Sequence, residues 1–294
     1  VVEALSTDTA PEDIAPPVLP KRAPRLVRRM EQLLQRLTDE NVQEVFHDAV
    51  QARSEALMLF NMRHLSLENR AWVDRAFRVV CQRIHEFVRD MPYVPEELAG
   101  LREMLAVTYF CNFSLFQSLP DHWAIKQLFP VVPLHRLKER PTQNGVIADV
   151  TCDSDGRIDQ FVDLEDVSST LPLHKLEDGE PYYLGFFLIG AYQEVLGDLH
   201  NLFGDTNIVH VSSGPEGYVI EKTVEGDSIV DVLSYLQYNR RQLLAQLRRQ
   251  VEASLKRGAM RLDQSAQFMR DMESRLDDYT YLQAEPDKPG RRRR

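Results

Sequence analysis

The sequence has few of the features that place a protein in a membrane or outside the cell. No stretch approaches the roughly 18 uninterrupted apolar residues of a membrane span, and no basic start with a short apolar run indicates a secretory signal. Cysteine is scarce, and Cys81, Cys111 and Cys152 lack the paired spacing of a metal site. Free thiols in a reducing compartment are therefore favoured over a disulfide framework. We expect a cytoplasmic chain without a membrane partner.

Positive charge is also in deficit. The 35 Lys and Arg residues face 45 Asp and Glu residues, which gives a formal net charge of -10, whereas nucleic-acid binding needs a basic face. We therefore expect no nucleic-acid partner. One basic run, Arg291 to Arg294, follows a Pro-Gly pair, and residues 283–294 are interpreted as a disordered tail, with a non-specific anion contact as the alternative. The chain also lacks an initiator Met, which indicates a fragment or a processed product.

Before this tail, residues 1–282 divide into four segments by composition and periodicity. Residues 1–24 contain many prolines and polar residues and are predicted to be a linker. Apolar residues at three- and four-residue steps over 25–110 predict an antiparallel bundle of four amphipathic helices. Short apolar runs bounded by Pro, Gly, Asn and Asp predict a β-rich domain over 111–225. Helical spacing returns over 226–282.

Several elements can be placed within these segments. The fourth helix of the bundle is expected over about 95–109, and residues 192–203 are spaced like a helix, although glycines weaken that assignment. Asp227 or Ser228 is a candidate N-cap for a helix that ends near Tyr235. Strands are expected over 113–119, 129–134, 146–150, 182–189, 208–211 and 218–221, and further helices over 243–255 and 263–276. The fold class is therefore α+β: a helical bundle with the character of an insertion, a sandwich- or barrel-like β-domain, and C-terminal helices.

The sharpest local motif is an acidic turn that begins with a thiol. The expected strand 146–150 runs into Thr-Cys152-Asp153-Ser-Asp155-Gly156. One interpretation is a structural β-turn in which Asp side chains bond their own backbone and Gly156 takes positive φ. Another is a functional thiol beside carboxylates. A calcium loop is the third, but the bidentate Glu and the remaining spacing of such loops are missing.

Two further segments combine glycine with polar side chains. In residues 188–193 an apolar strand breaks at Gly190 and presents Tyr192, whose hydroxyl could reach a phosphate or could serve packing alone. In residues 197–205, His200 lies among aspartates and glycines. These side chains could be metal ligands, but no two-histidine spacing supports such a site. The alternative is that they order the segment.

Taken together, the motifs carry a family resemblance. Residues 113–121, 149–156 and 190–205 closely resemble the C-terminal portion of the biosynthetic arginine decarboxylases, and the resemblance covers essentially the whole chain. More distantly, the chain is similar to the ornithine and diaminopimelate decarboxylases. In that superfamily a (β/α)8 barrel carries the cofactor lysine and phosphate site, and a β-domain follows it. The resemblance implies that this chain starts after the barrel and is inactive alone.

The resemblance also implies a cofactor, partners and roles for single residues. The cofactor is pyridoxal 5'-phosphate, with magnesium as a further candidate, and the reaction converts L-arginine to agmatine and CO2 in polyamine biosynthesis. Active sites in the family form between two subunits. There Cys152 would deliver a proton, Asp153 would bind the distal cation of the substrate, and Tyr192 would contact the cofactor phosphate.

The sequence departs from the ornithine enzymes at two places. They carry Cys-Asp-Gly where this chain has an extra carboxylate, Asp155, which suits a guanidinium. Residues 131–137 lack their Tyr-Asp pair, which leaves that part of the substrate site unmatched. A non-catalytic regulatory or partner subunit, derived from the same domain, is the alternative function.

Overall fold

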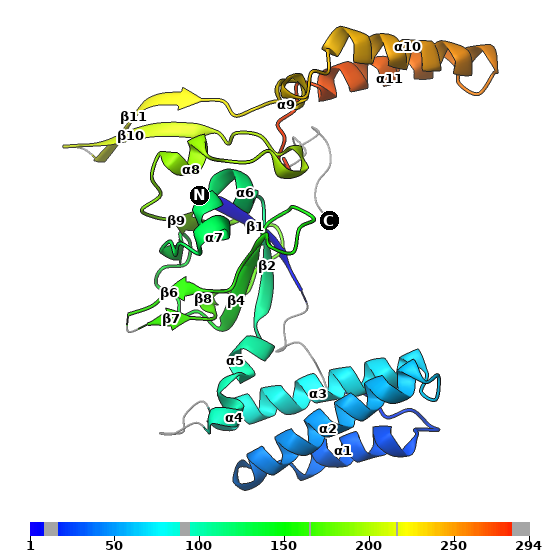
Figure 1. Ribbon diagram of the computed structural model, residues 1–294, viewed down its shortest axis with the longest axis vertical. Helices are drawn as coiled ribbons and strands as arrows, with labels where there is room; N and C mark the ends of the chain where they lie inside the picture. Colours follow the sequence, from blue (N-terminus) through cyan, green and yellow to red (C-terminus); the bar gives the residue numbers. More distant parts are fainter. Residues whose placement is uncertain (9–16, 89–94, 165, 216, 284–294) are drawn as a thin grey trace.

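The computed structural model describes residues 1–8, 17–88, 95–164, 166–215 and 217–283. Three parts follow one another along the long axis of the molecule (Figure 1): a helical bundle at one end, a sheet in the middle, and a ribbon with the C-terminal helices at the other end. The predicted α+β class and the order bundle, sheet and helices are confirmed. The basic tail predicted over 283–294 lies, apart from its first residue, outside the described residues.

The bundle is built on apolar stripes that were visible in the sequence. Its long helices within the described ranges are α1 (Arg25–Arg36), α2 (Val42–Asn61) and α3 (Leu67–Val88), with a 3-10 turn, η2 (Asp39–Asn41), between the first two. Val27 and Met30 of α1 pack with Val45 and Ala49 of α2 and Val80 of α3 in one buried cluster. A three- and four-residue spacing of apolar side chains forms this seam, because it keeps them on one helical face.

The prediction of a fourth long helix over 95–109 is wrong. The segment forms two short helices, α4 (Glu96–Ala99) and α5 (Leu101–Met104), and then a strand, β2 (Val107–Cys111). Gly100 separates the short helices. From Val107 onward, buried and less buried side chains alternate, which is the period of a strand and not of a helix. The sheet therefore begins before residue 111.

The linker expected over 1–24 also needs correction, because its first residues form a strand. β1 (Val2–Thr7) pairs antiparallel with β2 on one side and with β9 (Tyr182–Phe186) on the other. Six residues with two buried side chains, Val2 and Ala4, give a weak signal beside the proline-rich stretch that follows. Because β1 and β2 are neighbours, the bundle is inserted between adjacent strands of one sheet, as its character suggested.

The sheet is mixed and nearly closed into a barrel. The described strands follow the order β3-β9-β1-β2-β4-β5, and β8 also pairs with β4. The strands not yet given are β3 (Val131–Pro133), β4 (Gln143–Ala148), β5 (Arg157–Ile158), β8 (Leu171–Leu173) and, in a small separate hairpin, β6 (Phe161–Val162) and β7 (Val167–Ser168). β2 and β4 run parallel. Tyr109, Ile147, Leu173 and Leu184 fill the core.

Two segments beside the sheet differ from expectation. The strand predicted over 113–119 is replaced by a short helix, α6 (Leu115–Ser118), and a second short helix, α7 (Pro120–Ile125), follows it. Ser114 caps α6 by accepting the Gln117 N–H, at 3.3 Å, and this capping overrides the strand propensity of the phenylalanines. The helix expected over 192–203 is reduced to α8 (Tyr192–Val195) and a 3-10 turn, η3 (His200–Leu202).

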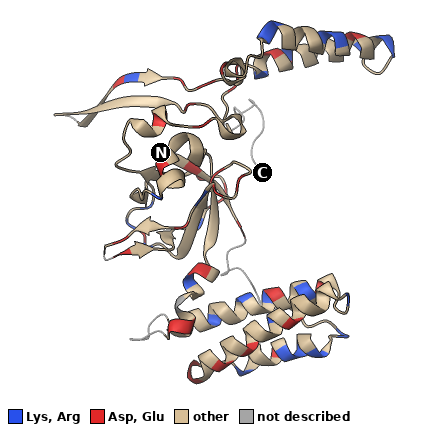
Figure 2. Ribbon diagram, in the orientation of Figure 1, with Lys and Arg blue, Asp and Glu red and all other residues tan. Residues whose placement is uncertain are grey.

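The C-terminal part follows prediction closely. A two-stranded ribbon, β10 (Ile208–Gly214) and β11 (Gly217–Val224), precedes three helices: α9 (Ile229–Tyr235), α10 (Arg240–Lys256) and α11 (Leu262–Arg275). Ser228 is the N-cap of α9, and its hydroxyl accepts the Asp231 N–H. Charged side chains gather most densely on the helices at the two ends (Figure 2). No helix within the described ranges is long and apolar enough to cross a bilayer.

Candidate active site

Asp149 anchors the acidic turn to the rest of the sheet domain. It follows the end of β4 and is only 5% exposed. Its Oδ2 accepts the Leu115 N–H of α6 at 2.8 Å, and its Oδ1 accepts the N–H and the hydroxyl of Thr151 at 2.9 and 2.8 Å. Burial raises the pKa of the Asp149 carboxyl, and these hydrogen bonds and the charge of His200 oppose that rise. The start of the turn is therefore fixed from two sides.

Gly156 ends the same turn and lies in close contact with Asp149. The Asp149 N–H donates to the Gly156 carbonyl at 2.8 Å, and a Cβ on Gly156 would lie 2.1 Å from Oδ1 of Asp149. Positive φ among glycines occurs at Gly179, Gly217 and Gly258, so the positive φ expected at Gly156 is wrong. Glycine is required here because the buried carboxylate leaves no room for a side chain.

We expect Gly156→Ala to destabilise the chain by about 1–3 kcal/mol, the usual cost of forcing an extra carbon into a packed site. Urea unfolding of the variant and the parent measures this difference. Gly100→Ala is the matched control, because a Cβ there has no atom within 4 Å. Equal loss of stability in both variants would contradict the close approach at Gly156.

The turn holds its backbone by its own side chains and leaves its functional atoms accessible. Asp153 Oδ1 accepts the Asp155 N–H at 2.9 Å, and the Gly156 N–H donates to the Asp153 carbonyl at 3.0 Å. These bonds are those of the structural β-turn. Yet Cys152 is exposed, whereas Cys81 and Cys111 are buried. The structural and functional interpretations of the motif are thus compatible.

Residues from distant parts of the chain brace the turn. The Cys152 N–H donates to Oδ1 of Asn201 at 2.9 Å, and the Trp123 indole N–H donates to Oδ2 of Asp155 at 3.4 Å. The Phe116 ring contacts the rings of Trp123 and His200, with centroid distances of 5.4 and 4.6 Å. The sequence pointed to the segment that contains His200, but it gave no sign of these contacts.

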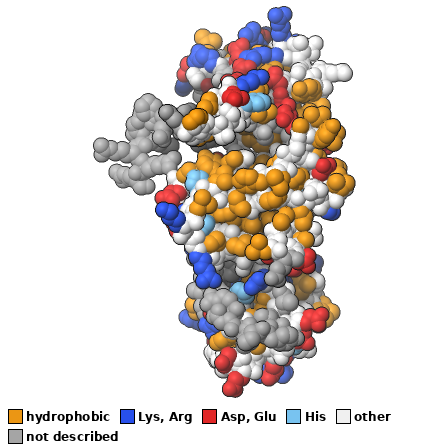
Figure 3. All heavy atoms as spheres, turned by 90° about the vertical axis from the view of Figure 1, so that its left-hand side faces the viewer, with side chains coloured by type: hydrophobic (Ala, Val, Ile, Leu, Met, Phe, Trp, Pro, Cys, Tyr) orange, Lys and Arg blue, Asp and Glu red, His pale blue; other side chains and the backbone are white. Residues whose placement is uncertain are grey.

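Tyr192, the predicted phosphate-binding residue, lies apart from this turn. It opens α8 and is 75% exposed. No hydrogen bond or ring contact joins it to residues 152–155 in the part of the chain that the structure describes. Its neighbours form an exposed apolar segment: Phe187, Leu188, Ile189, Val195 and Leu196. Apolar side chains also gather across the middle of the face shown in Figure 3.

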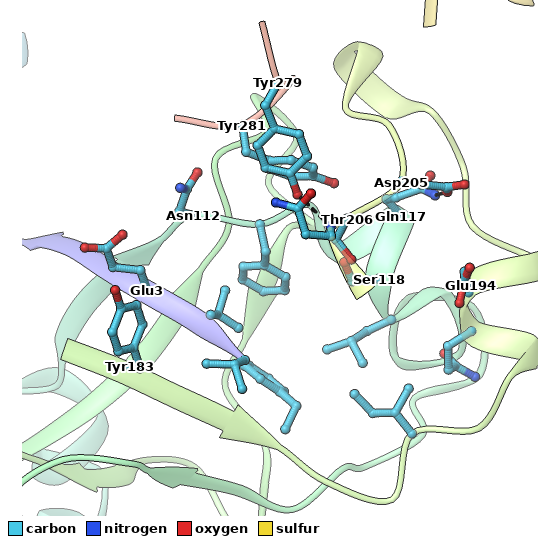
Figure 4. A pocket seen from close by; sticks show the side chains of 18 of the residues that line it. Glu3, Asn112, Gln117, Ser118, Tyr183, Glu194, Asp205, Thr206, Tyr279 and Tyr281 are labelled. Atoms are coloured by element: carbon cyan, nitrogen blue, oxygen red, sulfur yellow. Dashed lines mark hydrogen bonds between the residues drawn. The ribbon is translucent and has the colours of Figure 1, made fainter. Parts of the chain in front are cut away.

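A cavity of about 530 Å³ opens beside Tyr192, but Tyr192 does not line it. Gln117 of α6, Asp205, Tyr279 and Tyr281 contribute to its wall (Figure 4). The Gln117 side-chain N–H donates to Asp205 at 2.6 Å. Burial raises the pKa of Asp205, and the charge of Asp227 adds to the rise. The predicted residues of the 152–155 turn lie outside this cavity as well.

No metal site accompanies these features in the described ranges. They contain no group of three or more His, Cys, Asp or Glu side chains that could hold a metal ion. The calcium-loop interpretation of the acidic turn therefore gains no support. The same holds for the metal-ligand interpretation of His200 and its neighbouring aspartates.

Comparison with known proteins places the chain in a family. Residues 20–102 match the arginine decarboxylase helical bundle domain, and residues 229–282 match the arginine decarboxylase C-terminal helical extension. The biosynthetic arginine decarboxylase of Nostoc sp. is 45% identical over 282 residues, which cover 96% of this chain and 41% of the relative. The chain belongs to the biosynthetic arginine decarboxylase family. The resemblance stated from the motifs is confirmed.

Other arginine decarboxylases match this chain over a similar share of their length. The Gloeobacter violaceus enzyme is 48% identical over 262 residues, 87% of this chain and 41% of the relative. The crystal structure of the biosynthetic arginine decarboxylase from Campylobacter jejuni superposes with a TM-score of 0.80 at 30% identity, and covers 96% of this chain and 45% of that chain. The chain thus spans less than half the length of these decarboxylases and corresponds to their C-terminal portion.

Proposed function

We propose that the chain supplies the C-terminal part of a pyridoxal-phosphate-dependent enzyme that converts L-arginine to agmatine and CO2 in cytoplasmic polyamine biosynthesis. One observation carries the proposal: an anchored turn presents an exposed thiol and two carboxylates to the outside of the molecule. The turn gains rigidity from Asp149 and Asn201. Rigid support with accessible functional atoms is what a site shared with another polypeptide requires.

The side chains of this chain fit a share of the cofactor site. The Tyr192 hydroxyl is accessible and can donate to a phosphate oxygen, and it lies within the exposed apolar segment 187–196, which suits a covered interface. When bound, pyridoxal phosphate supplies an electron sink for the electron pair that CO2 loss leaves behind. The protein then has to orient the substrate and deliver a proton.

Cys152 is the group in the turn that can deliver this proton. Cys152 is exposed, and its backbone is held by the bond from its N–H to Asn201. A thiol S–H is a proton donor and can release its proton to a carbon that gains negative charge. General acid catalysis by a positioned side chain needs this combination of fixed backbone and accessible proton.

Asp153 is the candidate for the distal cation of arginine. A guanidinium is planar and permanently charged, so a carboxylate can accept two parallel hydrogen bonds from it. Oδ1 of Asp153 supports the turn, and Oδ2 faces away toward His200 at 3.9 Å. Asp155 already accepts the Trp123 indole N–H through Oδ2. We therefore assign the main contact to Asp153 and a supporting role to Asp155.

A second subunit and the remaining length of the enzyme complete the site in this proposal. The exposure of Cys152, Asp153 and Tyr192 supports it, because isolated exposed side chains cannot exclude water from a reaction. The three free cysteines agree with a cytoplasmic location. Magnesium finds no ligand cluster in the described residues, so no step is assigned to it.

The proposal is tested by joining this chain to the N-terminal portion of the Nostoc relative, so that the chimera has the full length of that enzyme. With pyridoxal phosphate and arginine, the chimera should release CO2 and agmatine, whereas the 294-residue chain alone should release neither. Sustained turnover by the chain alone would contradict the proposal that this chain supplies only part of the active site. If the chimera is inactive while the chain alters the rate of an intact relative, the regulatory-subunit function is favoured instead.

A further inference from the structure

The segment Gly197–Asp205 enters the proposed function only through the contact of Asn201 with Cys152, and the structure places it against the acidic turn. Asn201 lies in the left-handed region, with φ of 57°, and so does Leu202, with φ of 63°. Such backbone is uncommon for residues other than glycine, and asparagine tolerates it best. The unusual backbone brings the Asn201 side chain to the Cys152 N–H, at 2.9 Å.

His200 approaches the same turn from the preceding position. Its ring packs on Phe116 at 4.6 Å between centroids. Its Nε2 is buried without a hydrogen-bond partner and lies 3.9 Å from Oδ2 of Asp153. A buried polar nitrogen without a partner is costly, and in a native protein it calls for an explanation such as a role in catalysis. Oδ2 is also the atom of Asp153 that the turn's own hydrogen bonds leave unused.

We propose that Asn201 and His200 are positioning residues for the reaction: Asn201 fixes the backbone of Cys152 and so aims its thiol, and His200 directs the carboxylate of Asp153. The inference rests on the proposed function of Cys152 and Asp153. Neither residue touches the substrate. Asn201 would thus affect proton delivery, and His200 would affect guanidinium binding. Substitutions of the two residues should therefore have different kinetic effects.

The Asn201 contact is tested first on the 294-residue chain, without any activity. Asn201→Gly still allows the left-handed backbone but removes the side-chain oxygen that accepts the Cys152 N–H. Asn201→Asp keeps both the backbone conformation and an accepting oxygen. Amide hydrogen exchange at Cys152 should accelerate about tenfold in the Gly variant, the equivalent of one hydrogen bond. The Asp variant should retain protection. Equal exchange in parent, Gly and Asp chains would overturn the contact, whatever the chain's function is.

The separation of tasks is tested in the full-length chimera. Asn201→Gly should lower kcat about tenfold and leave KM for arginine nearly unchanged, while Asn201→Asp restores kcat. His200→Phe keeps a ring on Phe116 but lacks the nitrogen, and should raise KM about tenfold with little change in kcat. His200→Gln, which offers an N–H at a similar reach, should restore KM.

The outcomes distinguish positioning from simple support of the fold. A residue that only stabilises the turn would lower kcat and raise KM together, and the conservative variants would not restore one constant selectively. That pattern, or no change at all in the constants, overturns the inference. If the chimera is inactive in its parent form, the proposed function fails separately, and amide exchange at Cys152 still decides whether Asn201 holds it.

Discussion

Replacement of Cys152 by Ala in the complete enzyme should lower the rate of decarboxylation about 10²–10⁴-fold, the usual worth of a general acid, and leave cofactor binding intact. The thiol is accessible and its backbone is fixed by Asn201, so its loss removes a proton donor and no packing. The rate of CO2 release and the absorbance of bound cofactor measure the two effects separately.

The other cysteines cannot take over this role. Burial raises the pKa of the Cys81 thiol and of the Cys111 thiol to about 12 in each case, and both lie in the packed cores of the bundle and the sheet. They have no route to a substrate. Cys152→Ala therefore leaves no substitute thiol within this chain, and the loss of rate should be close to the full contribution of the acid.

The product of the Cys152→Ala enzyme gives a second readout. Without the thiol, part of the substrate should appear as an aldehyde by-product, because a substrate carbon left unprotonated would lose its amino group to the cofactor, and water would supply the aldehyde oxygen. Ser154→Ala removes a small exposed side chain from the same turn and is the matched control. If Cys152→Ala kept the parent rate and gave only agmatine, the thiol would have a structural role only.

Helices could be predicted from the apolar spacing within their own residues. Elements that form only by pairing with a distant segment could not. Apolar spacing identified α1, α2 and α3, because each helix buries one stripe of its own residues. β1 was missed, since its six residues become a strand only by pairing with β2, about a hundred residues later, and with β9. The pairing energy of a sheet lies between segments, and no single segment displays it.

The candidate site shows the same division. Cys152, Asp153 and Asp155 were found because they lie in one short turn after a strand. Asn201 and Trp123 were not, since the bonds that join them to the turn span 49 and 32 residues. Propensity was also misleading at α6, where the side chain of a single capping serine outweighed a run of strand-forming residues.

The Asp153→Asn enzyme should show a sharply raised Michaelis constant for arginine and an unchanged cofactor spectrum. Breaking a buried, hydrogen-bonded charge pair from one side costs on the order of 2–5 kcal/mol, and 1.4 kcal/mol corresponds to a factor of about ten. The constant should therefore rise at least tenfold. Asp178→Asn removes the same charge from an exposed loop and should leave the constant unchanged.

Because the site is proposed to lie between two subunits, the Asp153→Asn defect should also be complemented. A heterodimer of an Asp153→Asn subunit with a subunit that lacks the cofactor lysine has one interface in which both halves of the site are intact. Mixing the two defective enzymes under conditions of subunit exchange, at an arginine concentration far below the raised Michaelis constant, should restore agmatine formation at one of the two sites. Heterodimers that form but stay defective would show that Asp153 serves its own subunit or only shapes the turn.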